Sequence, residues 1–130
     1  MDTHAHILIA DDDATIRDAL RTKLESEGFR VTEAANGAEA VAQSTADRPD
    51  LIIMDVRMPD TSGTEAVVRI KSDPALRDIR IVFLSSLGEE EAGNVWMDQK
   101  YAREMGAVDF LKKDDDLNQI VEKIRAILNA

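Results

Sequence analysis

The chain has 130 residues, the length of about one domain, and carries 26 acidic against 16 basic side chains, a formal net charge of −10. This acidity argues against general nucleic-acid binding and against docking on an anionic membrane, and it favours a metal cation or a basic partner. Cysteine is absent, which removes disulfides and thiolate chemistry, and no signal peptide or membrane-length apolar run is present, so we expect one cytoplasmic domain over residues 1–130.

Short apolar runs alternate with helical periodicities along the chain. Uninterrupted apolar runs are typical of strands buried on both faces, and apolar residues three or four apart are typical of helices. The predicted elements, in chain order, are a strand at 7–10, a helix from about 14 to Gly28, an alternating strand at 30–34, a helix at 38–46, a strand at 51–54, a helix at 64–72, a strand at 81–84, a helix running to 105, a mixed strand at 108–111 and a helix from 117 to 128.

This strict alternation predicts an α/β fold, a doubly wound parallel sheet of five strands with helices on both faces. Parallel strands need right-handed crossovers, and here each crossover is a helix. Ligands of such folds bind beyond the carboxyl ends of the strands. We therefore look for the chemistry immediately after each apolar run.

Polar residues follow four of the five predicted strands. They are Asp11, Asp12 and Asp13 after the first, Asp55 after the third, Ser85 and Ser86 after the fourth, and Lys112 and Lys113 after the fifth. Taken singly, an Asp or Ser at such a point is most often a helix cap, as Asp13 is predicted to be for the first helix, and a Lys is most often solvated. The informative feature is their joint occurrence at one edge.

Carboxylates gathered at one edge repel one another unless a cation binds them. Oxygen ligands without nearby His or Cys suit Mg²⁺, with Mn²⁺ possible, rather than zinc. A hydroxyl and a lysine opposite the metal are what a phosphoryl group needs to spread its charge. The pattern therefore predicts a Mg²⁺-assisted phosphoryl-transfer site with a carboxylate acceptor.

The same residues carry a family resemblance that covers nearly the whole chain. The segment Leu8-Ile9-Ala10-Asp11-Asp12, the segment Asp55-Val56-Arg57-Met58-Pro59 with Gly63, and then Ser85 and Lys113 resemble the receiver domain of two-component response regulators. The single-domain chemotaxis regulator is the simplest member. The resemblance implies a flavodoxin-like sheet with strand order 2-1-3-4-5 and a single receiver domain over residues 1–130.

The resemblance also implies a role for each matching residue. Asp55 is the expected phosphoacceptor, supplied by a sensor histidine kinase or a phosphotransfer protein, and Lys113 and Ser85 are expected to contact the phosphoryl group. The expected metal ligands are Asp12, Asp55 and the backbone carbonyl of Arg57, with Asp11 acting through water. Ser85 and Phe110 are the expected switch residues. They are expected to control binding of a downstream protein by the face of the fourth helix, fifth strand and fifth helix, in a monomer or a phosphorylation-dependent dimer.

Three departures from the family pattern bear on these expectations. Asp114 stands where the family usually has a proline after the lysine, commonly joined to it by a cis peptide bond. We expect the Lys113–Asp114 peptide bond to be trans, or strained. If this misplaces Lys113, Lys112 is the expected substitute. Segment 86–105 is long and contains Trp96, predicted either at an exposed partner surface or buried by the segment folding back. Phe110 has no hydroxyl, so it must switch by packing.

Two other functions remain open. The spacing Asp11-x-Asp13-x-Thr15 resembles the nucleophile motif of haloacid-dehalogenase-type phosphatases, with Asp11 as nucleophile and Asp13 as acid/base. A degenerate receiver that docks partners without phosphorylation is the other. His4 and His6 are predicted to be ordinary residues at the start of the first strand rather than metal ligands.

Overall fold

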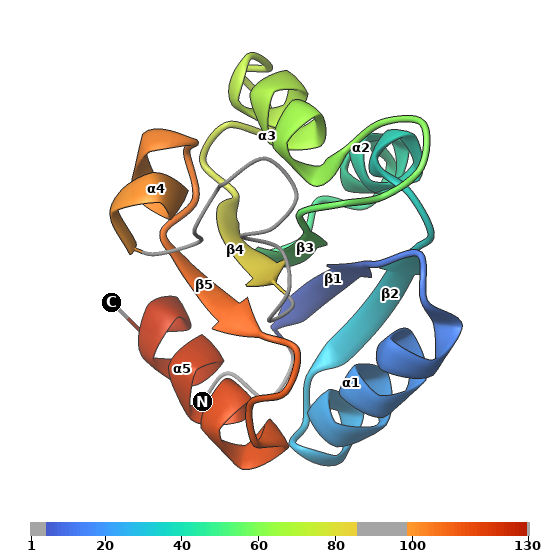
Figure 1. Ribbon diagram of the computed structural model, residues 1–130, viewed down its shortest axis with the longest axis vertical. Helices are drawn as coiled ribbons and strands as arrows, with labels where there is room; N and C mark the ends of the chain where they lie inside the picture. Colours follow the sequence, from blue (N-terminus) through green and yellow to red (C-terminus); the bar gives the residue numbers. More distant parts are fainter. Residues whose placement is uncertain (1–4, 86–98, 130) are drawn as a thin grey trace.

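The computed structural model describes residues 5–85 and 99–129. They form a five-stranded sheet in the order β2-β1-β3-β4-β5 with all neighbouring strands parallel, as predicted (Figure 1). The strands are β1 (His6–Ala10), β2 (Arg30–Ala34), β3 (Leu51–Asp55), β4 (Arg80–Ser85) and β5 (Asp109–Lys112). The helices are α1 (Ala14–Ser26), α2 (Gly37–Ala46), α3 (Gly63–Lys71), α4 (Gln99–Glu104) and α5 (Leu117–Leu128).

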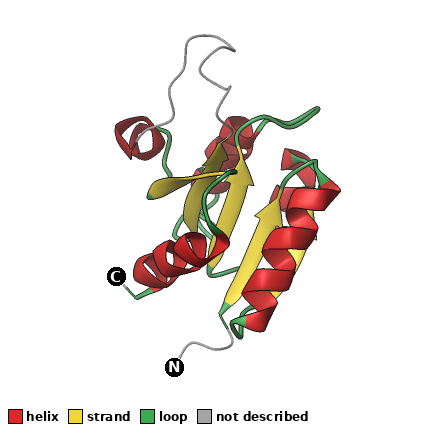
Figure 2. Ribbon diagram, turned by 60° about the horizontal axis from the view of Figure 1, so that its bottom comes forward, coloured by secondary structure: helices red, strands yellow, loops and turns green. Residues whose placement is uncertain are grey.

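Helices cover both faces of the sheet: α2, α3 and α4 lie on one side and α1 and α5 on the other (Figure 1), and Figure 2 shows the same layers from another side. One apolar cluster joins alternate strand residues to α2, α3 and α4 and includes Ile52, Met54 and Phe83. The other joins the intervening residues to α1 and α5 and includes Ile53, Leu84 and Leu24. Because successive strand residues point to opposite faces, the uninterrupted apolar runs serve both clusters.

Side chains just before four helices satisfy backbone N–H groups of the first turn. Asp13 accepts from the Thr15 amide, as predicted, and Asp116 accepts from the Asn118 amide. Asn36 and Ser62 cap α2 and α3 in the same way, accepting from Glu39 and Glu65. Because each cap directly precedes the helix, these two helices begin one residue earlier than predicted, at the glycines.

Several strands are longer than predicted, and this changes where the polar residues sit. Asp55 and Ser85 are the last residues of β3 and β4, so the parallel ladder itself holds their backbones. The fifth strand is shifted by one residue to Asp109–Lys112. The predictions for Trp96 and His4 fall outside the described residues. None of the described helices is long and apolar enough to span a membrane.

His6 is a buried strand residue, as predicted. Its Nε2 lies 2.8 Å from Thr32 Oγ1 on β2, and its Nδ1 lies 4.0 Å from an Asp47 oxygen. Burial, together with the Arg30 guanidinium, holds the pKa of His6 below its usual value, against the opposing effect of Asp47. His6 is therefore neutral when the protein is folded at neutral pH.

We expect His6 to make stability depend on pH. Below about pH 6.5 the unfolded chain takes up a proton that folded His6 does not, so the free energy of unfolding falls as pH falls towards the folded pKa. Urea denaturation of the native chain and of His6→Gln between pH 8 and pH 5 measures this. The difference between the two proteins should narrow as the pH falls below 6.5, by at most about 1.4 kcal/mol per pH unit. A constant difference would contradict the assignment.

Candidate functional site

The carboxyl edge of the sheet brings together Asp11, Asp12, Asp55 and Lys113, as the sequence predicts. Lys113 Nζ lies 3.2 Å from Asp11 Oδ2 and 3.3 Å from Asp55 Oδ2. Asp11 and Asp55 are almost fully buried, whereas Asp12 is exposed. β1 and β3 are neighbours in the sheet, which places the two buried carboxylates side by side.

The turn after β3 fixes the backbone around Asp55. Its Oδ1 accepts a hydrogen bond from the Arg57 amide at 3.3 Å, and the Gly63 amide donates to the Val56 carbonyl at 3.0 Å. A Cβ added at Gly63 would lie 1.9 Å from the Asp55 carbonyl oxygen, so only glycine allows this close approach. Within the turn, Asp60 adopts a left-handed conformation with φ of 64°.

Asp11 is held through several of its polar groups. Its amide donates to the Ala34 carbonyl at 3.0 Å, and its Oδ1 accepts from the Asp13 amide at 2.8 Å. Asp11 Oδ2 is left facing Lys113. The orientation of this carboxylate is therefore set by backbone groups on both sides.

The three charged groups influence one another strongly because they are shielded from water. Burial raises the pKa of Asp55 to about 7, and the Asp11 carboxylate adds to this, against the opposing attraction of Lys113. Burial lowers the pKa of Lys113, but the attraction of Asp55 and Asp11 outweighs it and leaves that pKa raised. Lys113 is therefore cationic at neutral pH, and Asp55 is easily protonated when no other cation is near.

Lys113 reaches the site although Asp114 follows it. The described residues contain no cis peptide bond, so the Lys113–Asp114 bond is trans, one of the two outcomes expected. The Lys113 amide donates to the Ser85 carbonyl at 2.8 Å, which ties this turn to the end of β4. Lys112 is exposed, and it is not needed as a substitute.

The residues fit a divalent metal ion. Asp11, Asp12 and Asp55 each offer a carboxylate oxygen, and these oxygens lie within 4.8 Å of one another. Within the described part of the chain, Asp11 Oδ2 and Asp55 Oδ2 are buried and face the Lys113 ammonium at 3.2 and 3.3 Å without a hydrogen bond of regular geometry, so both can take a further cation. An all-oxygen donor set suits Mg²⁺ or Mn²⁺.

The two predicted switch residues lie on the neighbouring strands β4 and β5. Ser85 is buried at the end of β4, where it pairs in register with Lys112 of β5. Phe110 is half-buried on β5 and packs against the cluster that includes Phe83. Lys123 of α5 lies 5.2 Å from the centre of the Phe110 ring and donates to the Phe110 carbonyl at 3.1 Å.

The geometry does not favour the phosphatase alternative. Asp13, the acid/base in that hypothesis, is exposed and its side chain caps α1. The three acids that do converge are Asp11, Asp12 and Asp55, a set that leaves Asp13 out.

Sequence reasoning missed Arg17, whose guanidinium donates to the Asp11 carbonyl. Arg17 is the fourth residue of α1, which begins directly after Asp13. No composition or periodicity rule distinguishes such a residue from an exposed helix arginine.

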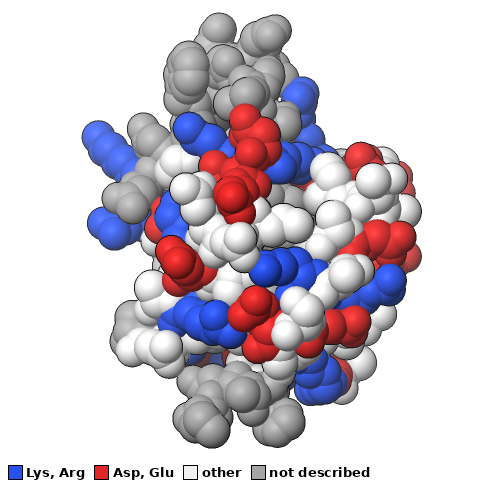
Figure 3. Space-filling view, turned by 90° about the horizontal axis from the view of Figure 1, so that it is seen from below, with Lys and Arg blue, Asp and Glu red and all other residues white. Residues whose placement is uncertain are grey.

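Charged side chains of both signs share the face that carries α1 and α5 (Figure 3). A group of acidic side chains lies near the top of that view with Lys and Arg beside it, and charges of both signs are interspersed over the rest of the face.

Comparisons with known proteins agree with this geometry. The family model described as the response regulator receiver domain matches residues 7–125. Protein PilH of Pseudomonas aeruginosa is 32% identical over 124 residues, covering 95% of this chain and 98% of PilH. The phosphate regulon transcriptional regulatory protein PhoB of the same organism is 36% identical over 122 residues, covering 94% of this chain and 51% of PhoB. The chain thus spans about half the length of PhoB.

Solved structures share the fold over almost the whole chain. A putative response regulator from Chloroflexus aurantiacus superposes with a TM-score of 0.85 at 30% identity, covering 97% of this chain and 98% of that one. Chemotaxis protein CheY4 of Vibrio cholerae gives a TM-score of 0.82 at 27% identity, covering 95% and 98%.

We expect Lys113→Met to destabilise the metal-free protein by about 3 kcal/mol at pH 8, because it leaves two buried carboxylates without their cation. The loss in free energy of unfolding should be smaller at pH 5, because Asp55, with its raised pKa, is protonated there. Urea denaturation measures both values.

Lys112→Met is the matched control, since Lys112 is exposed and a surface change of this kind costs at most about 0.5 kcal/mol. Adding Asp55→Asn to Lys113→Met should recover most of the lost stability. Equal effects of the two lysine variants would show that the ion pairs do not support the fold.

Proposed function

Since this chain belongs to the response regulator receiver domain family, and is therefore a signalling domain, we propose that Asp55 is its phosphoacceptor. The observation that carries this is the position of Asp55, a buried carboxylate at the end of β3 paired with Lys113 and next to Asp11. The donor we propose is the phosphohistidine of a sensor histidine kinase or a phosphotransfer protein.

The proposed transfer exchanges one bond to phosphorus for another. A carboxylate oxygen of Asp55 forms the new P–O bond while the P–N bond to histidine breaks, and the electron pair of that bond returns to the imidazole, which takes up a proton. Asp55 must be ionised to attack, and its raised pKa leaves it only partly ionised at neutral pH, so a bound divalent cation would favour the reactive form. Self-phosphorylation by small phosphodonors and slow hydrolysis of the acyl phosphate are part of the same proposal.

The residues proposed to hold Mg²⁺ are Asp11, Asp12, Asp55 and the backbone carbonyl of Arg57. The ion, when bound, would neutralise the acids and the charge of the phosphoryl oxygens. The two buried carboxylates that share a single ammonium group, Lys113, support this assignment. Because the three acids already lie close together, little rearrangement is needed to bind a cation.

Lys113 and Ser85 are proposed to contact the phosphoryl group. Lys113 Nζ already lies beside the Asp55 oxygen and is held cationic by its surroundings. Ser85 ends the strand next to Asp55, because Leu84 is paired in register with Asp55. Attraction of the Ser85 hydroxyl towards phosphate would draw the end of β4 inward and let Phe110 repack.

We propose that phosphorylation is read out by the face that contains α4, β5 and α5, through a downstream protein target. Phe110 links the site to this face, since it packs in the core and contacts Lys123 of α5. We further propose a cytoplasmic protein whose residues 1–130 form one receiver domain, monomeric or dimerising on phosphorylation. A phosphorylation-independent receiver is the alternative to be excluded.

Incubation with acetyl phosphate and Mg²⁺ tests the phosphoacceptor. We expect intact-mass spectrometry to show addition of one phosphoryl group to the native chain and none to Asp55→Asn. Chelating the metal should also prevent the modification.

Asp60→Asn is the matched control, since it removes a carboxylate from the same turn. Asn tolerates the left-handed conformation that Asp60 adopts, so the turn should be preserved and the modification retained. Modification of Asp55→Asn at the native level would move the acceptor to another residue. An unmodified native chain would favour the phosphorylation-independent alternative.

A further inference from the structure

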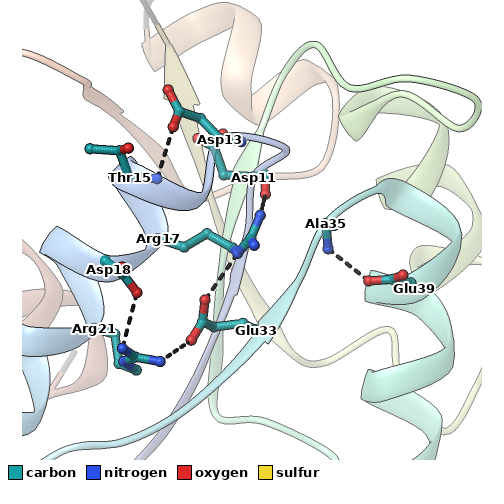
Figure 4. Close-up of polar contacts among 9 residues, drawn as sticks. All are labelled: Asp11, Asp13, Thr15, Arg17, Asp18, Arg21, Glu33, Ala35 and Glu39. Atoms are coloured by element: carbon teal, nitrogen blue, oxygen red, sulfur yellow. Dashed lines mark hydrogen bonds and ion pairs between the residues drawn. The ribbon is translucent and has the colours of Figure 1, made fainter.

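We propose that Arg17 is a positioning residue for the metal-binding acids, which it orders by holding the peptide group between Asp11 and Asp12. Arg17 Nη1 donates a hydrogen bond of 2.6 Å to the Asp11 carbonyl oxygen (Figure 4). The inference rests on the proposed function, because it assigns Arg17 to the same site.

The Asp11 carbonyl lies where the sheet no longer supplies a partner. The ladders of β1 with β2 and with β3 both end at Ala10. The Asp11 amide still reaches the Ala34 carbonyl, and the carbonyl of Asp11 is met by Arg17 instead of a strand. A peptide group is planar, so fixing this carbonyl also fixes the amide of Asp12. The exposed Asp12 side chain therefore starts from a backbone that Arg17 holds in place.

Arg17 is itself held in one orientation. Its side chain is 18% exposed, and its Nε donates to Glu33 Oε1 on β2 at 2.9 Å. Glu33 Oε2 accepts from Arg21 at 2.6 Å, and Arg21 also pairs with Asp18 at 3.0 Å. A guanidinium is a rigid planar fork, so a bond on Nε sets the direction of Nη1. Figure 4 shows this chain of contacts running from α1 to β2.

The charges of this network cancel, since Arg17 and Arg21 face Glu33 and Asp18. A cation approaching the acids therefore meets little net charge from the network, and the contribution of Arg17 is geometric. Replacing Arg17 with a neutral residue then has two opposed effects. The added net negative charge would tighten Mg²⁺ binding, whereas loss of the carbonyl contact would weaken it. The sign of the change separates the two explanations.

Isothermal titration of Mg²⁺ into the metal-free full chain tests the proposal with Arg17→Met and Arg21→Met. Both variants remove one positive charge from the same network, but Arg21 does not hold the Asp11 carbonyl. We expect Arg17→Met to weaken Mg²⁺ binding about tenfold, equivalent to about 1.4 kcal/mol, and Arg21→Met to leave it unchanged or tighter. Arg17→Lys, which keeps the charge and one donor, should recover part of the affinity.

Hydrogen exchange in the absence of metal gives a readout that needs no ligand. The Asp13 amide donates to Asp11 Oδ1, so it reports on the ordering of this turn. We expect it to exchange faster in Arg17→Met than in Arg21→Met when urea denaturation shows both to be folded. If the native chain binds Mg²⁺ and the two variants bind it equally, or Arg17→Met binds it more tightly, the positioning role is wrong.

The proposed function fails by a different result. If the native chain binds Mg²⁺ but Asp55 is not phosphorylated, the phosphoacceptor proposal falls and the role of Arg17 at the metal-binding acids is still decided by the titration. If the native chain binds no Mg²⁺, both proposals are overturned.

Discussion

The structure of the site depends on one arrangement of charge, an ammonium group held between two buried carboxylates. Lys113 Nζ lies within 3.3 Å of both Asp11 and Asp55. Removing ionised groups from water is costly, and a single lysine does not offset two carboxylates and their mutual repulsion. The raised pKa of Asp55 expresses that imbalance. A site with this excess of negative charge favours binding of a further cation, and for this reason its acids suit a divalent metal ion.

The backbone of the α/β fold makes this arrangement possible. Asp55 and Ser85 occupy the last positions of adjacent strands, and the turn that carries Lys113 is bonded to the Ser85 carbonyl. Gly63 lets α3 begin against the Asp55 carbonyl, a contact that any side chain would block. The charged groups are therefore placed by hydrogen bonds and close packing of the main chain. This placement does not depend on the attraction between the charged side chains.

The same strands connect the site to the surfaces of the molecule. Because alternate residues of each strand point to opposite faces, each strand that ends at the site packs against both layers of helices. Phe110 and Lys123 join β5 to α5 on one side of the site, and Arg17 and Glu33 join α1 to β2 on the other. The first pair lies on the face proposed to bind a target. The second supports the acids proposed to bind the metal.

The sequence by itself determined the order and type of the elements, the parallel sheet and the acids and lysine at its carboxyl edge. Apolar runs and helical periodicity are local signals that predict the strands and helices. Because parallel strands end at one edge of the sheet, the residues that follow them are predicted to form one site. Element ends were predicted less well, because caps such as Asn36 and Ser62 and the ladder positions of Asp55 and Ser85 decide them. Only the tertiary structure decided that Lys113 reaches the acids although Asp114 follows it, and that Arg17 turns towards Asp11. Each of these is a choice of side-chain direction, which depends on partners distant in the chain and leaves no periodic trace in the sequence.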